Sequence, residues 1–413
     1  MARQPKSFFT PERRTLLEDL TGLSETDTAA LELVGRYAAE KLWPQYEAIN
    51  ADRRAFHAAM DSLIDPKQLG FRGSFLPEDL GGIDLSIPAY MMGLEMLSQG
   101  NASVALSLAI DGSVLSALSR LGDEQQLGRY VRDALRDKRM TAFALTEPGY
   151  GSDAGNLETR ATTDGASWKL NGQKTWTTNG GWADYYFVVC RTNPDRNLGP
   201  AGLSVLMVHK EEIAAIEQIP KYTVPGSYTA TLTFADSVVP AADGAARLVG
   251  SVDTGFMDAK RLLEGGRITI ASFGLGIASE AFEMALDYTR TRESQGEALI
   301  EKQAIALPLA EFDARLDAAR LMTYTAAKRM QAGRMENAEA SKAKLLGSEL
   351  AAELADFNRR VHGSYGLAKE YRCVQLIHDA GVAVTGEGTS EIQKILIASN
   401  RKKRTGKDPG FRP

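Results

Sequence analysis

The chain has little cysteine and little histidine. Its 413 residues include two cysteines and four histidines, at Cys190, Cys373, His57, His209, His362 and His378. Two thiols cannot make a disulfide framework, and a protein with so few is typical of a reducing compartment, so we expect a cytoplasmic location. The histidines show no metal-ligand spacing. The sequence therefore predicts neither a disulfide-stabilised scaffold nor a metal centre.

Long apolar runs and a strong charge of one sign are also missing. No stretch approaches the ~20 uncharged apolar residues of a bilayer span, and residues 1–14 lack the apolar core of a signal peptide, so we expect no integral membrane segment. The formal net charge of −5 argues against a nucleic-acid partner. A basic cluster from Arg401 to Lys407 is expected to be a solvated terminus.

What the chain does have is a hydrophobic pattern that changes twice. Residues 1–140 show helical spacing, residues 141–250 show strand texture, and residues 251–413 return to helical spacing. In the middle region Trp168–Leu170 is predicted to run into a turn at Asn171–Gly172. In the last region Pro308 is expected to kink its helix or to mark its first turn. The pattern predicts an α+β multidomain protein with an all-α domain, a β domain and a helical bundle.

Several common chemistries are disfavoured. Gly274–Ser279 resembles the start of a dinucleotide fingerprint but lies inside a helical pattern, where tight helix packing is the better explanation. Ser152 and Ser364 lack the flanking glycines of a nucleophile elbow. No phosphate-binding P-loop lysine is present. Carboxylates, hydroxyls and glycine-rich turns are left to carry any chemistry.

Three segments collect such residues, and each also has an ordinary structural interpretation. Leu145–Asp153 offers hydroxyls and two glycines that would let the backbone approach a ligand, or it is an interdomain linker. Trp176–Gly181 could pack an aromatic ring against a fused heterocycle, or it is a hairpin. Gly386–Lys394 contains a helix cap at Thr389 or Ser390, and Glu387 between two glycines could reach into a cleft as a general base.

The order of these segments resembles the acyl-CoA dehydrogenase family of flavoproteins over almost the whole chain. The matching pieces are Pro77–Gly82, Ala144–Asp153, Trp168–Asp184, Gly266–Ile268 with Leu275–Ala278, and Glu387–Gln393. The resemblance implies an N-terminal helical domain, a middle β-barrel or sandwich domain and a C-terminal four-helix bundle, assembled as a homotetramer or a homodimer. It also implies bound FAD, an acyl-CoA substrate and an electron-transferring flavoprotein as electron acceptor.

The resemblance also implies roles for single residues. Leu145, Thr146, Trp176 and Thr178 match positions at the flavin ring, while Thr389 and Glu391 match further FAD contacts. Arg292 and Gln303 match residues that reach the FAD of a neighbouring subunit, and Arg360, Gly363 and Ser364 fall in the turn near the FAD adenosine. Ser152, Glu264, Arg267 and Gly388 are expected at the substrate.

The mechanism implied by the family uses one carboxylate. Glu387 is expected to remove the α-proton of the thioester while a hydride leaves the β-carbon for flavin N5, and its backbone N–H is expected to stabilise the enolate. Some relatives carry the base on the helix near Gly266 instead. That position is glycine here, and Glu264 is the only nearby substitute, so we favour Glu387.

Departures from the family pattern keep two alternatives open. Gln295 replaces an aromatic residue, and Arg360, Ser364 and His378 change the side that faces the cofactor phosphates and adenosine. The chain could therefore be a relative with another flavin reaction, such as oxidation by dioxygen or elimination, or a non-catalytic subunit of a mixed tetramer. No arginine or lysine lies between Ala89 and Ser119, which predicts an uncharged acyl group.

Overall fold

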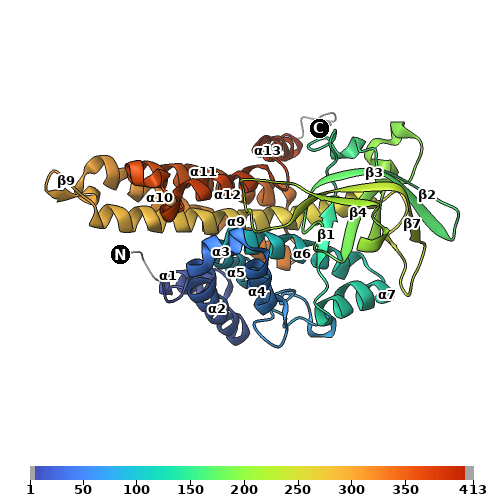
Figure 1. The fold of residues 1–413 in the computed structure, drawn as a ribbon, viewed down its shortest axis with the longest axis horizontal. Helices are drawn as coiled ribbons and strands as arrows, with labels where there is room; N and C mark the ends of the chain where they lie inside the picture. The colour runs from blue at the N-terminus through green and yellow to red at the C-terminus, as the bar shows by residue number, and fades with distance from the viewer. Residues whose placement is uncertain (1–4, 405–413) are drawn as a thin grey trace.

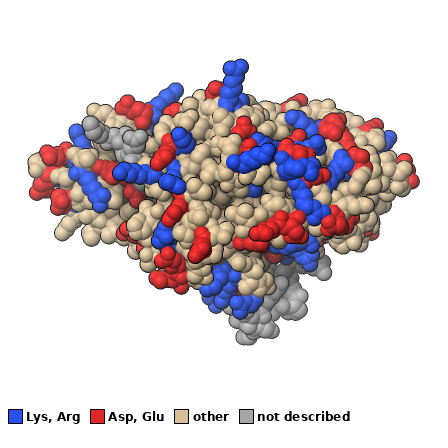
Figure 2. All heavy atoms as spheres, turned by 90° about the horizontal axis from the view of Figure 1, so that it is seen from below, with Lys and Arg blue, Asp and Glu red and all other residues tan. Residues whose placement is uncertain are grey.

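The computed structural model describes residues 5–404 and consists of three regions in chain order (Figure 1). An N-terminal group of helices lies beside a long helical bundle, and a β domain lies at one end of that bundle. The side chains of most of the basic cluster near the C-terminus lie outside the described residues. On the face shown in Figure 2, lysine and arginine alternate with aspartate and glutamate, and no large area carries one sign.

The N-terminal region is helical. Its helices are α1 (Pro11–Thr21), α2 (Glu25–Tyr37), α3 (Tyr46–Ala51), α4 (Arg53–Ile64), α5 (Ile87–Gly100), α6 (Ala102–Leu121), α7 (Glu124–Leu127) and α8 (Ala134–Arg136). Local sequence signals fix several of their ends. Ser24 and Asp27 form a reciprocal capping box at α2, and the Asn101 side chain accepts from the backbone N–H of Val104 where α5 gives way to α6.

The middle region is a single eight-stranded sheet. Its strands are β1 (Thr141–Ala144), β2 (Arg160–Thr163), β3 (Ser167–Thr178), β4 (Tyr185–Arg191), β5 (Leu203–His209), β6 (Ala215–Gln218), β7 (Thr229–Pro240) and β8 (Leu248–Val249). Their order is β6-β7-β3-β2-β4-β5-β8, and β1 pairs in parallel with β4. β4 and β5 are buried along their whole length, which explains their continuous apolar sequence.

The predicted turn at Asn171–Gly172 is wrong. Both residues lie inside β3, at a shift in its register with β7. Gly172 has a φ of 139°, and a β-carbon there would lie 2.6 Å from the Cα of Thr159 on the neighbouring segment. The glycine therefore serves a bulge and a close backbone approach within a long strand rather than a hairpin.

The C-terminal region contains the bundle helices α9 (Gly255–Thr291), α10 (Gln303–Gln331), α11 (Asn337–Val361) and α12 (Cys373–Thr385), followed by α13 (Ser390–Arg404). A two-stranded hairpin of β9 (Glu293–Ser294) and β10 (Glu297–Ala298) joins α9 to α10. Pro308 lies inside α10, beyond its first turn. A β-carbon at Gly274 would lie 2.8 Å from the Gly347 carbonyl oxygen, which confirms tight helix packing at that glycine run.

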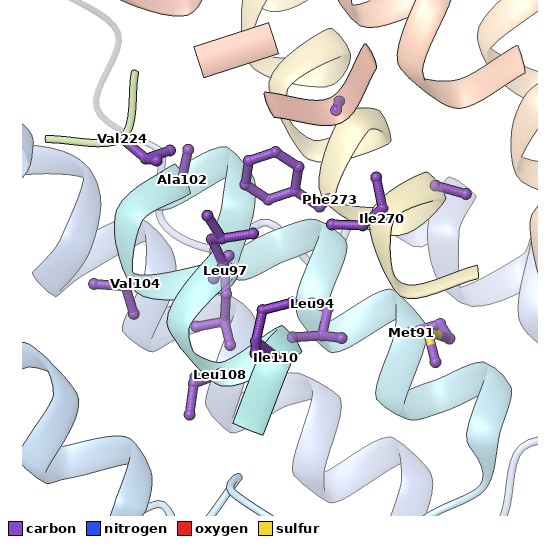
Figure 3. Packing of buried hydrophobic residues seen from close by; sticks show 14 of the residues in the cluster. Met91, Leu94, Leu97, Ala102, Val104, Leu108, Ile110, Val224, Ile270 and Phe273 are labelled. Carbon is purple, nitrogen blue, oxygen red and sulfur yellow. The ribbon is translucent and has the colours of Figure 1, made fainter. Parts of the chain in front are cut away.

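Two helices, α6 and α9, are long and apolar enough to cross a membrane by length and composition, with mean hydropathies of 1.5 and 1.2. Neither is the uncharged apolar stretch of a bilayer span, because α6 contains Asp111 and Arg120 and α9 contains Arg267 and Glu280. Both are core helices, however, because 89% and 83% of their apolar windows are buried inside the molecule. Figure 3 shows Leu97, Ile110, Ile270 and Phe273 from α5, α6 and α9 converging in one core cluster.

Candidate active site

Glu387 lies in the short connection between α12 and α13, and its backbone adopts a left-handed conformation with φ 54°. Gly386 and Gly388 flank it, and Gly388 has a φ of 92°. The carboxyl group is directed at α9, where a β-carbon added to Gly266 would lie 2.7 Å from Glu387 Oε2. The absence of a side chain at Gly266 therefore provides the space that the Glu387 carboxylate occupies.

The Glu387 carboxyl is poised to accept a proton near neutral pH. Its Oε2 is buried and has no hydrogen-bond partner among the described residues. Burial raises the pKa of Glu387 from 4.5 to about 7, against the opposing attraction of the cations Arg267 and Lys344. A carboxylate with this pKa and a free oxygen has the properties of a general base rather than of a structural ion pair.

Arg267 is the next residue along α9 and is buried. One of its terminal nitrogens donates to Asn337 Oδ1 at the start of α11, and its Nε has no partner. Burial lowers its pKa, and the carboxylates of Glu387 and Glu264 oppose that effect. The structure thus brings Arg267 close to Glu387, while Glu264 contributes charge near Arg267.

Lys344 on α11 is a residue near the base that the sequence reasoning missed. Its side chain is fully buried, and Nζ donates to the carbonyl oxygen of Val384 at 2.8 Å. Burial lowers its pKa to about 8. A detectable signal was present in the sequence, because Lys344 shares a helical face with Ser348, Ala351 and Ala355, where a lysine is out of place.

The connection that carries Glu387 is held from α13. Gln393 Nε2 donates to the carbonyl oxygens of Glu387 and Gly388, at 3.1 and 2.9 Å. The Thr389 hydroxyl accepts from the Ile392 backbone N–H at 3.4 Å, which confirms the predicted helix cap. Glu391 is exposed in the first turn of α13. Ser390 Oγ and Gln393 Oε1 are buried and have no hydrogen-bond partner within residues 5–404, so polar atoms at this end of α13 remain available to a ligand.

A cavity of about 330 Å³, open mouth included, lies between α5, α6 and α9. Its lining is Phe75, Ile87, Tyr90, Met91, Gly112, Ser113, Ser116, Arg120, Leu262, Gly265, Thr269 and Met330. The lining residue Gly265 is the neighbour of Gly266 along α9, and a β-carbon there would lie 3.0 Å from the terminal methyl of Met330. Arg120 lies one residue beyond Ala89–Ser119, the interval that contains no arginine or lysine. It is exposed, and its Nε donates to the Ser116 carbonyl oxygen at 3.1 Å.

The Leu145–Asp153 segment is tied to the sheet by a buried lysine. Lys174 Nζ on β3 donates to the Leu145 carbonyl oxygen at 2.9 Å and to Glu147 Oε1 at 2.8 Å. The Thr146 carbonyl accepts from the Thr175 backbone N–H at 2.8 Å. These bonds fix Leu145 and Thr146 against β3, whereas Ser152 lies exposed farther along the loop.

Trp176 near the end of β3 is held outward by its backbone. It has a φ of 55° at a second register shift between β3 and β7, and its side chain is 58% exposed. Thr178, two residues later, is half-buried. The left-handed backbone at Trp176 leaves the indole ring exposed, so the ring is available to pack on a planar ligand.

Five residues that were expected to bind the cofactor lie far from Trp176 and Thr178. All five are exposed, where α9 connects to α10 and where α11 connects to α12, a region that we call the bundle tip: Arg292, Gln303, Arg360, Gly363 and Ser364. Stacking of Tyr288 on His362, with ring centroids 4.0 Å apart, joins the two sides of this tip. The β9 hairpin marks this tip, which lies at the opposite end of the bundle from the β domain (Figure 1). These residues therefore do not converge with Trp176 within one chain.

The departures from the family pattern have structural explanations at two positions. Gln295 has a φ of 58° and forms the β9 hairpin turn with Gly296. His378 lies beside Tyr222, with ring centroids 5.6 Å apart, next to the buried Asp379. The Asp379 carboxylate accepts from the Tyr46 hydroxyl and from the Val224 backbone N–H, both at 2.6 Å, and so fastens α12 to the loop before β7.

Comparison with known proteins assigns the family. Residues 24–138, 142–237 and 253–401 match the N-terminal, middle and C-terminal domains of acyl-CoA dehydrogenase. A mitochondrial short-chain specific acyl-CoA dehydrogenase of Bos taurus is 33% identical, over 92% of this chain and 90% of its own. Subunit CarC of the caffeyl-CoA reductase-Etf complex of Acetobacterium woodii is 32% identical, over 80% of this chain and 86% of its own.

A solved structure agrees. Butyryl-CoA dehydrogenase from Megasphaera elsdenii superposes with a TM-score of 0.85 at 28% identity, covering 92% of this chain and 98% of that one. The chain belongs to the acyl-CoA dehydrogenase family. It is an oxidoreductase of the acyl-CoA dehydrogenase type, from a family that is FAD-dependent.

Proposed function

We propose that this enzyme removes the α-proton and the β-hydride of an acyl-CoA thioester, with Glu387 as the base. The observation that carries the proposal is the buried Oε2 of Glu387, which lies beside Gly266 and has no hydrogen-bond partner among the described residues. A thioester α-proton is only weakly acidic, so the enolate must be stabilised as the proton leaves. The backbone N–H of Glu387 has no protein acceptor among the described residues and could donate to the thioester oxygen.

We propose FAD as the cofactor, and the residues fit it. Exposed Trp176, half-buried Thr178 and the tied segment Leu145–Thr146 offer a ring face, a hydroxyl and an ordered backbone. Buried Ser390 and Gln393 have free polar atoms beside the base. When bound, FAD would supply the acceptor for the β-hydride. Thr389 and Glu391 would contact FAD from α13.

The proposed substrate is an acyl-CoA with a short, uncharged acyl group. Most of the cavity lining is apolar, and its single cation, Arg120, lies exposed with Glu264 as its opposing charge. A carboxylate on the acyl group would have no cation deeper in the cavity. Ser152 and Arg267 are proposed to contact the CoA part, and Gly388 to lie against the thioester.

The test is activity after reconstitution with FAD. Straight, branched, cyclic and dicarboxylic acyl-CoAs of two to eight carbons would be supplied with an electron-accepting dye, and formation of the enoyl-CoA would be followed by mass spectrometry. We expect turnover with a short uncharged acyl-CoA. Preference for a glutaryl-type or succinyl-type thioester, lost in Arg120→Met, would overturn the acyl assignment.

The electron acceptor is proposed to be an electron-transferring flavoprotein, which the similarity to an Etf-complex subunit supports. Two alternatives give other outcomes in the same assay. Dioxygen consumption without dye reduction would identify an oxidase, and absence of a flavin absorption band after reconstitution would identify a non-catalytic subunit of a mixed tetramer.

The assembly is proposed to be a homotetramer or a homodimer. Leu307, Leu321 and Leu346 are large exposed apolar residues on α10 and α11, and the bundle tip holds expected cofactor residues that cannot reach Trp176 in the same chain. Light scattering of the reconstituted protein tests this.

A cytoplasmic location is also proposed, in keeping with two buried, unpaired cysteines; fractionation of the source cells would check it.

A further inference from the structure

The base loop is held at its other side by Lys344. Helix α12 ends at Thr385, so its last carbonyl oxygens need partners outside the helix. The Lys344 ammonium supplies one by donating to Val384 O at 2.8 Å, three residues before Glu387. A cation at a helix C-terminus also complements the negative end of the helix dipole. Lys344 and Gln393 thus hold the segment that carries the base from α11 and α13.

The ammonium is buried without an ion pair within 4 Å among the described residues. The carboxylates that act on its charge are Glu349 on its own helix, Glu387 in the loop and Glu391 on α13, and Arg267 on α9 repels it. Glu387 in turn faces two cations, Arg267 and Lys344. Burying an ammonium is costly unless its charge is compensated, and here the charge acts on the Glu387 carboxylate, whose Oε2 has no hydrogen-bond partner among the described residues.

We propose that Lys344 is a positioning residue for the base: its hydrogen bond to Val384 fixes the end of α12, and its charge favours the ionised form of the Glu387 carboxylate. This inference rests on the proposed function, because it assigns to Glu387 the removal of the α-proton. It assigns Lys344 no contact with substrate. Replacement of Lys344 should therefore change the pH dependence and the rate of proton transfer to Glu387, and should leave acyl-CoA binding nearly unchanged.

The experiment isolates the proton transfer from the redox step. A 3-thia acyl-CoA has sulfur at the β position and cannot lose a β-hydride, yet its α-proton can be taken by Glu387 and replaced from D₂O. Exchange is followed by mass spectrometry from pH 5.5 to 9.5 on the FAD-reconstituted protein. The variants are Lys344→Met, Lys344→Gln, which keeps a donor without the charge, and Lys344→Arg. Lys342→Met, on the same helix and half-buried, is the matched control.

We expect the acid limb of the exchange profile to move up by about one pH unit in Lys344→Met and Lys344→Gln, so exchange at pH 6 falls about tenfold and recovers above pH 8.5. Lys344→Arg and Lys342→Met should keep the wild-type acid limb. If Lys344→Met does not fold, Lys344→Gln carries the test. An unmoved acid limb in the neutral variants, or an equal loss at every pH in all three, would overturn the inference. Failure of the wild-type protein to exchange any acyl-CoA would instead refute the proposed function.

Discussion

Replacing Glu387 by glutamine should remove activity and at the same time stabilise the protein at alkaline pH. The amide matches the carboxylate in size, so the space beside Gly266 stays filled. It cannot ionise or accept the α-proton. Loss of a positioned general base costs roughly 10²–10⁴ in rate, and we expect kcat to fall within that range.

The stability change follows from the raised pKa. Between pH 4.5 and about 7 the unfolded carboxyl loses its proton while the folded one keeps it, so the wild-type protein loses stability as pH rises through this window. A rise of the pKa from 4.5 to about 7 corresponds to at most about 3 kcal/mol at pH 8. Glutamine carries no such cost, and the variant should be more stable than wild type at pH 8 and equally stable at pH 4.5.

Two measurements test the predicted loss of activity and the predicted change in stability. The pH profile of kcat/KM in wild type should rise about tenfold from pH 6 to pH 8, because Glu387 must be ionised. The melting temperature of Glu387→Gln minus that of wild type should increase over the same range. Glu217→Gln, at an exposed glutamate on β6, is the control and should change neither. Wild-type turnover in Glu387→Gln, or a melting-temperature difference that does not depend on pH, would refute the reasoning.

Three further changes probe the surroundings of the base. Gly266→Ala places a β-carbon 2.7 Å from Glu387 Oε2, so the carboxylate must move and kcat should fall roughly 10- to 100-fold, as steady-state assays would show. Lys174→Met leaves the Glu147 carboxylate buried without its cation, and calorimetry should record a loss of about 3–5 kcal/mol together with weaker flavin retention. Arg292→Ala should lower flavin content after dialysis without lowering the melting temperature, because the residue is exposed at the bundle tip; unchanged flavin content would count against the shared site.

Much of the fold could be predicted because it depends on spacing along the chain. The Gly274–Ser279 run was assigned to helix packing from its helical surroundings, and α9 does pack there on Gly347. Residue type and position predict a cap at Thr389 or Ser390, and it is the Thr389 hydroxyl that accepts from the Ile392 backbone N–H. Asn171–Gly172 misled because the same pair serves a hairpin turn or a bulge, and only the length of the paired strand decides between them.

The supports of the site could not be read from the sequence in the same way. Lys174 and Lys344 are buried, and each donates to a carbonyl oxygen that is distant in sequence, 29 and 40 residues away. Lysine is ordinarily a surface residue. The helical pattern marks Lys344 as out of place on a buried face, but it does not show which carbonyl oxygen either lysine binds. The five exposed residues of the bundle tip are a different case, because the site they are expected to complete would belong to another copy of the chain.

The geometry of α9 favours Glu387 over Glu264 as the proposed base. Glu264 precedes Gly266 by two residues, which turns it about 200° around the helix axis and away from the Glu387 carboxylate. Its charge acts on Arg120 and Arg267 instead. A carboxylate placed at position 266 itself would need the volume that Glu387 Oε2 occupies. A carboxylate at 266 and the present position of Glu387 therefore exclude each other in this chain, and with glycine at 266 we expect the proposed proton transfer to depend on Glu387.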